Sequence, residues 1–292
     1  MKFIVMLAVL LLRGVPGRSL TRPLDQAFQA WQGGWAKRTQ RGMGSSLVFL
    51  LSVLPWVVLL WVVLWWVDGL FWSLPTLALH LLVVFYALGR RSELVWLERY
   101  MIAWRQGDHQ AASYYAEELL ERSVDAANDE DLHSQVVARI LYLAFERSFL
   151  VLFWYLLLGP LGALMARLSE LAISYARQQG EVDEQVHHFH QVLEWPAVRL
   201  MGLTLGLVSR PWAGLLAFFR DLPQWRLSAE AFLYRQFLVA AGSAEVADEQ
   251  RSLRPELMSE EADQEMLWIR EWVWRSLAVW VAATALGVIF WG

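Results

Sequence analysis

Two long stretches without a charged residue constrain this chain more than any other feature. Residues 47–67 and 70–88 contain no Asp, Glu, Lys or Arg over 21 and 19 residues respectively. A helix rises about 1.5 Å per residue, so each stretch reaches roughly the 30 Å thickness of the hydrocarbon core of a bilayer. Only Asp68 and Gly69 separate the two stretches, and this spacing predicts a helical hairpin in a membrane.

The composition agrees with a membrane location. Hydrophobic residues make up 57% of the 292 positions and charged residues 18%, whereas a soluble domain has about 45–50% and 25%. The apolar residues are gathered into blocks instead of being spread along the chain. The 18 tryptophans suit a protein with several lipid–water boundaries, where the indole ring is favoured.

Three further segments are apolar enough to enter a membrane. Residues 273–291 form a last span, and residues 149–166 a third one that Gly159-Pro160 can break into a re-entrant pair. Residues 197–219 are apolar but contain two arginines, so we expect a re-entrant segment or a fifth span. Arginines before residue 47 and after residue 88 place both ends of the first hairpin in the cytoplasm.

The remaining segments are typical of helices in water. Residues 90–147 and 167–270 mix charged with apolar positions, and Gly107-Asp108 predicts a break between two of their helices. The apolar run at residues 3–12 rises only about 15 Å; it resembles a signal-peptide core but lacks an Ala-x-Ala site, so we favour a helix at the membrane interface. The predicted fold is an all-α polytopic membrane protein, a helical bundle with cytoplasmic helical insertions in one domain.

Several classes of chemistry lack their sequence signatures. The chain has no cysteine, which excludes disulfides, iron–sulfur clusters and thiol catalysis. A net charge of −4 gives no reason to expect a nucleic-acid partner. Phosphate-binding loops, nucleophile elbows and His-Glu-x-x-His motifs are absent as well, so we expect no cofactor and assign no catalytic residue.

A group of histidines is the only hint of a metal site. His187, His188 and His190 lie within four residues, and a helix would place His187 and His190 on one face. No carboxylate pair was found at a matching spacing, and a solvated loop explains the group equally well. His187 and His190 are therefore an incomplete set of metal ligands.

Charged residues flank two of the apolar segments. Glu146 precedes the third apolar block and Arg167 follows it, while Glu194 and Arg199 lie at the entrance to the segment that contains Gly202. An unpaired charge is costly to bury in a membrane. These side chains are either interfacial anchors or a polar cluster between helices, and we take the four together as the candidate binding cluster.

Three short blocks carry a resemblance to a known family. They are residues 145–154 (FERSFLVLFW), residues 159–162 (GPLG) and residues 194–202 (EWPAVRLMG). Together with the order of the segments, which covers nearly the whole chain, they resemble the AmpE family. The resemblance implies a regulatory protein of the bacterial inner membrane, linked with AmpD in β-lactamase induction and in the response to antibiotics that act on the cell wall.

AmpE is in turn similar to the CobD/CbiB-like superfamily of membrane amide synthases in cobalamin biosynthesis. Three residues match the motif of that superfamily: Trp195, Arg199 and Leu200. Glu194 replaces its asparagine, and His190 and Gln191 stand in place of its paired aspartates. Amide synthesis with ATP requires acidic residues that hold magnesium, so their loss implies that the synthase activity is lost.

We therefore expect a protein that regulates by binding a ligand or a partner, without turnover. The expected partners are the lipid bilayer and a cytoplasmic or membrane signalling protein; an AmpD-linked pathway and a homo-oligomer remain open. The alternative function is a CobD/CbiB-like amide synthase. A transporter would require a second broken helix related to Gly159-Pro160 by symmetry, and the sequence contains no such mate.

Overall fold

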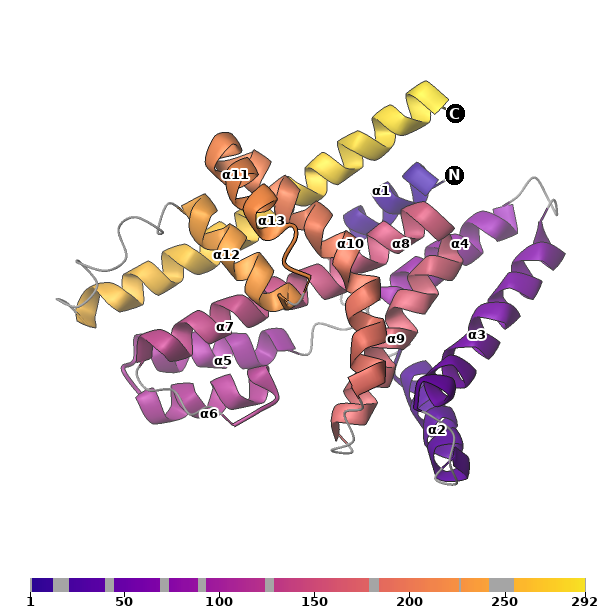
Figure 1. The fold of residues 1–292 in the computed structure, drawn as a ribbon, viewed down its shortest axis with the longest axis horizontal. Helices are drawn as coiled ribbons and strands as arrows, with labels where there is room; N and C mark the ends of the chain where they lie inside the picture. The colour runs from indigo at the N-terminus through magenta and orange to yellow at the C-terminus, as the bar shows by residue number, and fades with distance from the viewer. Residues whose placement is uncertain are drawn as a thin grey trace. The chain divides into compact units, whose positions relative to one another are not determined.

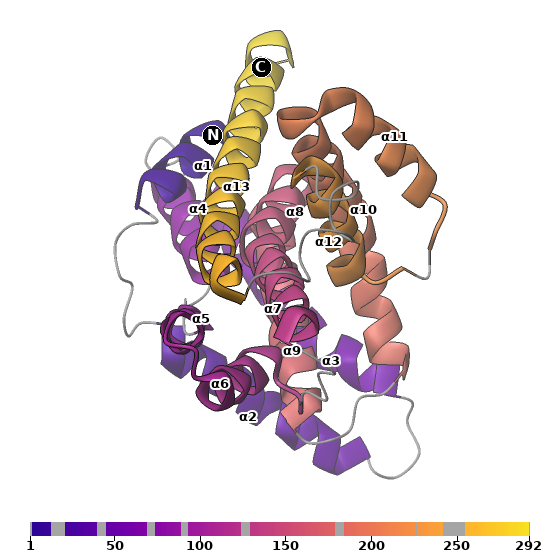
Figure 2. The ribbon, with the colours of Figure 1, turned by 90° about the vertical axis from the view of Figure 1, so that its left-hand side faces the viewer.

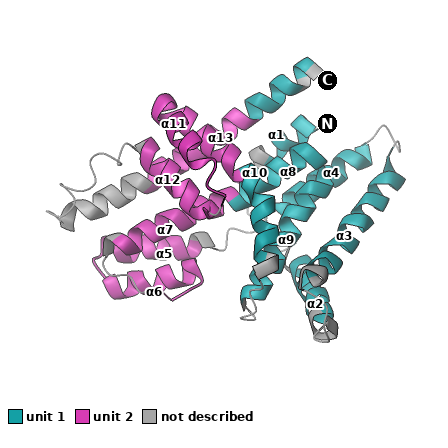
Figure 3. Ribbon diagram, in the orientation of Figure 1, with its two compact units in different colours: residues 1–90, 146–197, 281–292 teal, residues 91–145, 198–280 magenta. Residues whose placement is uncertain are grey.

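The computed structural model describes residues 2–12, 21–39, 45–68, 74–88, 93–123, 129–178, 184–225, 227–241 and 255–291, and every regular element among them is a helix (Figure 1). The all-α part of the predicted fold is thus confirmed. The chain divides into two compact units (Figure 3). Unit 1 comprises residues 1–90, 146–197 and 281–292, and unit 2 comprises residues 91–145 and 198–280.

Unit 1 is built around one central helix. Its helices are α1 (Lys2–Leu12), α2 (Thr21–Thr39), α3 (Ser45–Val67), α4 (Leu74–Ala87), α8 (Val151–Leu158) and α9 (Pro160–Gln178), with the first part of α10 (Glu184–Ser209) and the end of α13 (Pro255–Trp291). α9 packs against α2, α3, α4 and α8, and α1 packs against α4 and α8 (Figure 1). The apolar run at residues 3–12 forms α1, whose Lys2 Nζ donates a hydrogen bond to the Leu156 carbonyl at 2.7 Å.

The core of unit 1 joins helices that are distant in the sequence. Its buried residues come from α2, α3 and α9: Phe28, Phe49, Val53, Leu168, Leu171 and Ala172. Phe189 of α10 packs on this core, and its ring centroid lies 4.9 Å from that of Phe49. The start of α10 is therefore fixed against α3.

α3 exposes apolar side chains along much of its length. Its 23 residues rise about 34 Å, slightly more than the hydrocarbon core of a bilayer. Trp61, Trp65 and Trp66 are exposed, the last at 74% of its surface. A continuous apolar surface of this kind is typical of a face that contacts lipid or a partner.

Two of the described helical segments are long and apolar enough to cross a membrane: Phe49–Val67 of α3 and His187–Ser209 of α10. They differ in burial, because 17% of the α3 segment is buried against 56% of the α10 segment. A mostly buried apolar helix is equally at home in a protein core. Of the two segments, that of α3 is thus the one whose apolar side chains are mostly exposed.

The predicted break at Gly159-Pro160 is confirmed. Gly159 has φ +68°, a left-handed conformation that glycine adopts without steric cost, and it ends α8 before Pro160 begins α9. α8 has eight residues and rises about 12 Å. The segment 149–166 is consequently no single straight helix.

The segment 197–219 is also divided. α10 ends at Ser209, Arg210 is not helical, and α11 (Pro211–Asp221) begins with a proline in its first position. Proline is favoured there because its missing N–H has no helical acceptor to lose. The apolar helix before the break starts at Glu184, earlier than the sequence pattern suggested.

Unit 2 contains a compact group of three helices, α5 (Glu93–Arg105), α6 (His109–Leu120) and α7 (Asp129–Ala144), which pack on one another (Figure 2). The predicted break between α5 and α6 is confirmed: Asp108 Oδ1 caps α6 by accepting the Ala111 N–H at 3.0 Å. α12 (Ala229–Ala241) packs against α7 and α11. The rest of α10 and most of α13 complete this unit.

Candidate functional site

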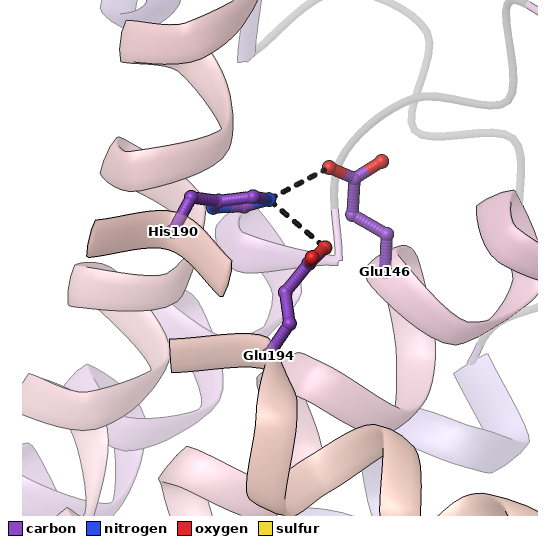
Figure 4. A group of neighbouring side chains, drawn as sticks. All are labelled: Glu146, His190 and Glu194. Atoms are coloured by element: carbon purple, nitrogen blue, oxygen red, sulfur yellow. Dashed lines mark ion pairs between the residues drawn. The ribbon is translucent and has the colours of Figure 1, made fainter. Parts of the chain in front are cut away.

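Three ionisable side chains converge within unit 1. His190 Nε2 lies 2.9 Å from Glu194 Oε1 and 3.7 Å from Glu146 Oε1. One ligand atom from each of the three residues lies within 4.8 Å of the other two. Figure 4 shows both carboxylates directed at the same edge of the imidazole ring. We refer to these residues as the Glu–His–Glu cluster.

Two different chain segments build this cluster. His190 and Glu194 are four residues apart on α10, so the helix places them on one face. Glu146 belongs to η2 (Phe145–Leu150), a π-helical segment between α7 and α8. π-helical turns are rare and often occur at functional sites.

Contacts on either side of the cluster fix the two segments relative to each other. The Trp154 indole Nε1 donates a hydrogen bond to the Leu193 carbonyl at 3.2 Å and so ties α8 to α10. Pro196 of α10 has no N–H, which leaves the Val192 carbonyl without its usual helical donor. The Trp154–Leu193 hydrogen bond and the Phe189–Phe49 contact hold α10 where Glu194 can face Glu146.

The electrostatics of the cluster require a positive charge. The side chains of His190 and Glu194 are 3% and 6% exposed, and that of Glu146 is 12% exposed. Two carboxylates this close in a poorly hydrated environment repel each other, and each is costly to bury unless it is paired. A protonated imidazole supplies a positive charge that pairs with both carboxylates. A bound cation would pair with both carboxylates while the imidazole stays neutral.

A second charged network in unit 1 contains Arg167. Its Nη2 lies 3.1 Å from Asp25 Oδ2 and its Nη1 lies 2.7 Å from Glu170 Oε2. Tyr86 donates a hydrogen bond to Asp25 Oδ1 at 3.0 Å. Burial would lower the pKa of Arg167, but the carboxylates of Glu170 and Asp25 raise it above its usual value. This network joins α2, α4 and α9.

Arg199 makes its contacts within unit 2. Its Nη2 donates a hydrogen bond to the Gln224 carbonyl at 2.9 Å, and its guanidinium lies 4.0 Å from the centroid of the Phe232 ring. A cation over an aromatic face at this distance is a stabilising contact. Arg199 therefore joins α10 to α12 and to the loop before it.

The four residues of the predicted binding cluster are thus placed as follows. The structure brings Glu146 and Glu194 together through His190. It holds Arg167 with Asp25 and Glu170, and it holds Arg199 within unit 2. His187 is exposed and contacts the Gln191 side chain at 3.0 Å, whereas His190 joins the carboxylates.

Comparison with known proteins gives one match. A family model described as "Regulatory signalling modulator protein AmpE" matches residues 35–249, well over half of the chain. The chain belongs to the AmpE family. No curated protein and no solved structure matches it. The assignment confirms the AmpE resemblance seen in the sequence and a regulatory class of function; it does not extend to the CobD/CbiB-like superfamily.

The two most specific sequence blocks of this AmpE-family chain meet at the Glu–His–Glu cluster. The block at residues 145–154 supplies Glu146 and the Trp154 indole, and the block that begins at Glu194 directly follows the carbonyl that accepts from Trp154. Two of the blocks that carried the resemblance therefore supply both carboxylates of the cluster.

Sequence reasoning on this AmpE-family chain missed the carboxylate partners of His190. It compared His190 with His187, three residues earlier, and overlooked Glu194, four residues later on the same helical face. That i, i+4 spacing was a usable signal. Glu146 lies 44 positions away from His190, and no local pattern links them.

Proposed function

We propose that this AmpE-family member is a multi-pass protein of the bacterial inner membrane that takes part in β-lactamase induction and in the response to antibiotics that act on the cell wall. It acts by binding a ligand or a signalling partner, without turnover. The observation that carries the proposal is the family match over residues 35–249. A modulator of signalling must be placed where the signal arises, and it needs a site that binds a ligand or a partner.

The membrane location is supported by the surface of α3. Its segment Phe49–Val67 is charge-free and only 17% buried, and it exposes Trp61, Trp65 and Trp66. In water this surface would cost free energy roughly in proportion to its apolar area, whereas in lipid it costs none. Arginines on both sides of the first hairpin favour cytoplasmic ends for it.

The binding role is supported by the concentration of buried polar groups in unit 1. The Glu–His–Glu cluster and the network around Arg167 are both largely shielded from solvent among the helices of unit 1. Buried ionisable groups contribute little net stability compared with apolar side chains of the same size. Such groups among membrane helices commonly serve function.

A genetic experiment tests the proposal. The gene is deleted in its host, and β-lactamase induction by a cell-wall antibiotic is measured with and without plasmid-borne copies of the gene. We expect altered induction in the deletion strain, restoration by the wild-type copy and by His188→Ala, an exposed control on α10, and no restoration by Glu194→Ala or Arg199→Ala.

The outcomes separate the parts of the proposal. Unchanged induction in the deletion strain would contradict the regulatory role. Altered induction with full restoration by both point variants would retain the regulatory role and reject these residues as its site. Magnesium-dependent nucleotide hydrolysis by the purified protein in the presence of cobyric acid would contradict action without turnover and favour the amide synthase.

A further inference from the structure

We propose that the Glu–His–Glu cluster binds one divalent transition-metal ion of the class that includes Zn²⁺. The proposal stands on the geometry, burial and ligand chemistry of Glu146, His190 and Glu194. It goes beyond the regulatory role proposed above and does not depend on it.

The spacing of the ligand atoms suits a metal ion. In a tetrahedral site with bonds of about 2.1 Å, neighbouring ligand atoms are about 3.4 Å apart. The His190 Nε2 atom lies 2.9 Å from Glu194 Oε1 and 3.7 Å from Glu146 Oε1, values on either side of that separation. All three ligand atoms lie within 4.8 Å of one another, close enough for a single ion to contact them all.

The charge of a divalent ion matches that of the two carboxylates in the cluster. Glu146 and Glu194 bring two carboxylates into a site whose three side chains are only 3–12% exposed. A divalent cation bound by a neutral imidazole balances both carboxylates. Neutralising a buried charge removes a large desolvation cost.

The types of ligand narrow the choice of metal. Mg²⁺ and Ca²⁺ prefer sites made entirely of oxygen ligands, whereas an imidazole nitrogen with carboxylates suits Zn²⁺ and neighbouring transition metals. Three protein ligands is also the number found in zinc sites that keep a fourth position for water or a ligand. Glu146 has the most exposed side chain of the three, at 12%.

The cluster is held as a metal site requires. Ligands must be kept close to their bound positions by the groups around them. The Trp154–Leu193 hydrogen bond fixes α8 to α10 one residue before Glu194, and Phe189, one residue before His190, is packed on Phe49. These contacts belong to the protein itself and so preorganise the cluster before an ion binds.

Titration with Zn²⁺ tests the proposal on the full-length protein, purified in detergent and stripped of metal with a chelator. Isothermal calorimetry should show one tight Zn²⁺ per chain. His190→Gln and Glu194→Gln should each weaken binding at least about 100-fold, since loss of a supporting group alone costs 10–100-fold. The matched control is His187→Gln with His188→Gln, which removes two exposed imidazoles from the same helix and should leave the tight site unchanged.

X-ray absorption on the Zn²⁺-loaded wild type keeps the test decisive if a variant does not fold. It should show one imidazole nitrogen and carboxylate oxygens around the ion, and the ion should raise the melting temperature of the wild type. Absence of tight binding, unchanged affinity in Glu194→Gln, loss of the site in the His187/His188 control, or a metal shell without imidazole would each overturn the proposal. The induction experiment is unaffected by any of these results.

Discussion

At the scale of single residues, the notable feature is a set of buried charges in a chain that is otherwise rich in apolar side chains. Arg167 and Asp25 are 142 positions apart and have side chains only 7% and 8% exposed, yet their charged atoms are 3.1 Å apart. Glu170 and Tyr86 complete the network. Since a buried pair gains little over an apolar pair but loses much when one partner is removed, the network is a sensitive point of unit 1.

Arg167→Met should therefore destabilise the protein by about 3–5 kcal/mol, because it leaves the buried carboxylate of Asp25 and the partly buried one of Glu170 without this cation. Thermal unfolding in detergent measures the loss. Arg177→Met is the matched control, since Arg177 is exposed ten residues later on the same helix, and it should change stability by less than about 0.5 kcal/mol. Equal melting temperatures for the two variants would contradict this account of Arg167.

At the scale of elements, close helix packing in unit 2 depends on glycines of α10 and α11. Gly202 and Gly206 lie four residues apart on α10, a GxxxG spacing that lets another helix approach closely. A Cβ added to Gly206 would lie 3.0 Å from the Gly214 Cα atom, and one added to Gly202 would collide with the Phe232 ring. The backbones of α10 and α11 thus meet where neither has a side chain.

Gly214→Ala should destabilise unit 2 by about 1–3 kcal/mol, because its Cβ would overlap the Gly206 backbone, which cannot move aside easily. Gly34→Ala provides the comparison. Nothing lies within 4 Å of a Cβ at that helical position, so the change should be neutral or stabilising by up to about 1 kcal/mol. Melting temperatures of both variants test the pair; a neutral Gly214→Ala would show that the contact is not tight.

The elements were easier to predict from the sequence than the site, for a physical reason. The breaks at Gly107-Asp108 and Gly159-Pro160 follow from local backbone chemistry, and the apolar run of α3 is evident from its composition. The partners of Arg167 and Glu146 come from segments that only the folded chain brings near. Charge and burial suggest that such groups need partners, but they do not say which.

At the scale of the whole molecule, the central expectation is the membrane topology of the first hairpin. It rests on the charge-free segments and on the exposed apolar surface of α3. The chain contains no cysteine, so a single introduced cysteine reports its own position without background. Topology can therefore be mapped in intact cells.

Asp68→Cys should react with a membrane-impermeant thiol reagent added to intact cells with a permeabilised outer membrane, because the turn after α3 faces outward in the proposed topology. Gln106→Cys, in the exposed turn after α5, should react only after the inner membrane is opened. The opposite labelling pattern would show that the hairpin has the reverse orientation in the membrane. Recovery of the purified protein as a soluble monomer without detergent would exclude a membrane-spanning hairpin altogether.

The interleaving of the two units has a consequence for how the protein is made. Unit 1 includes residues 1–90 and 281–292, and all of unit 2, residues 91–145 and 198–280, is encoded between these two segments. At a synthesis rate of about 5–20 residues per second, roughly 10–40 s pass between residue 90 and residue 281 on the ribosome. The early helices of unit 1 must therefore wait through that delay before residues 281–292 can join them.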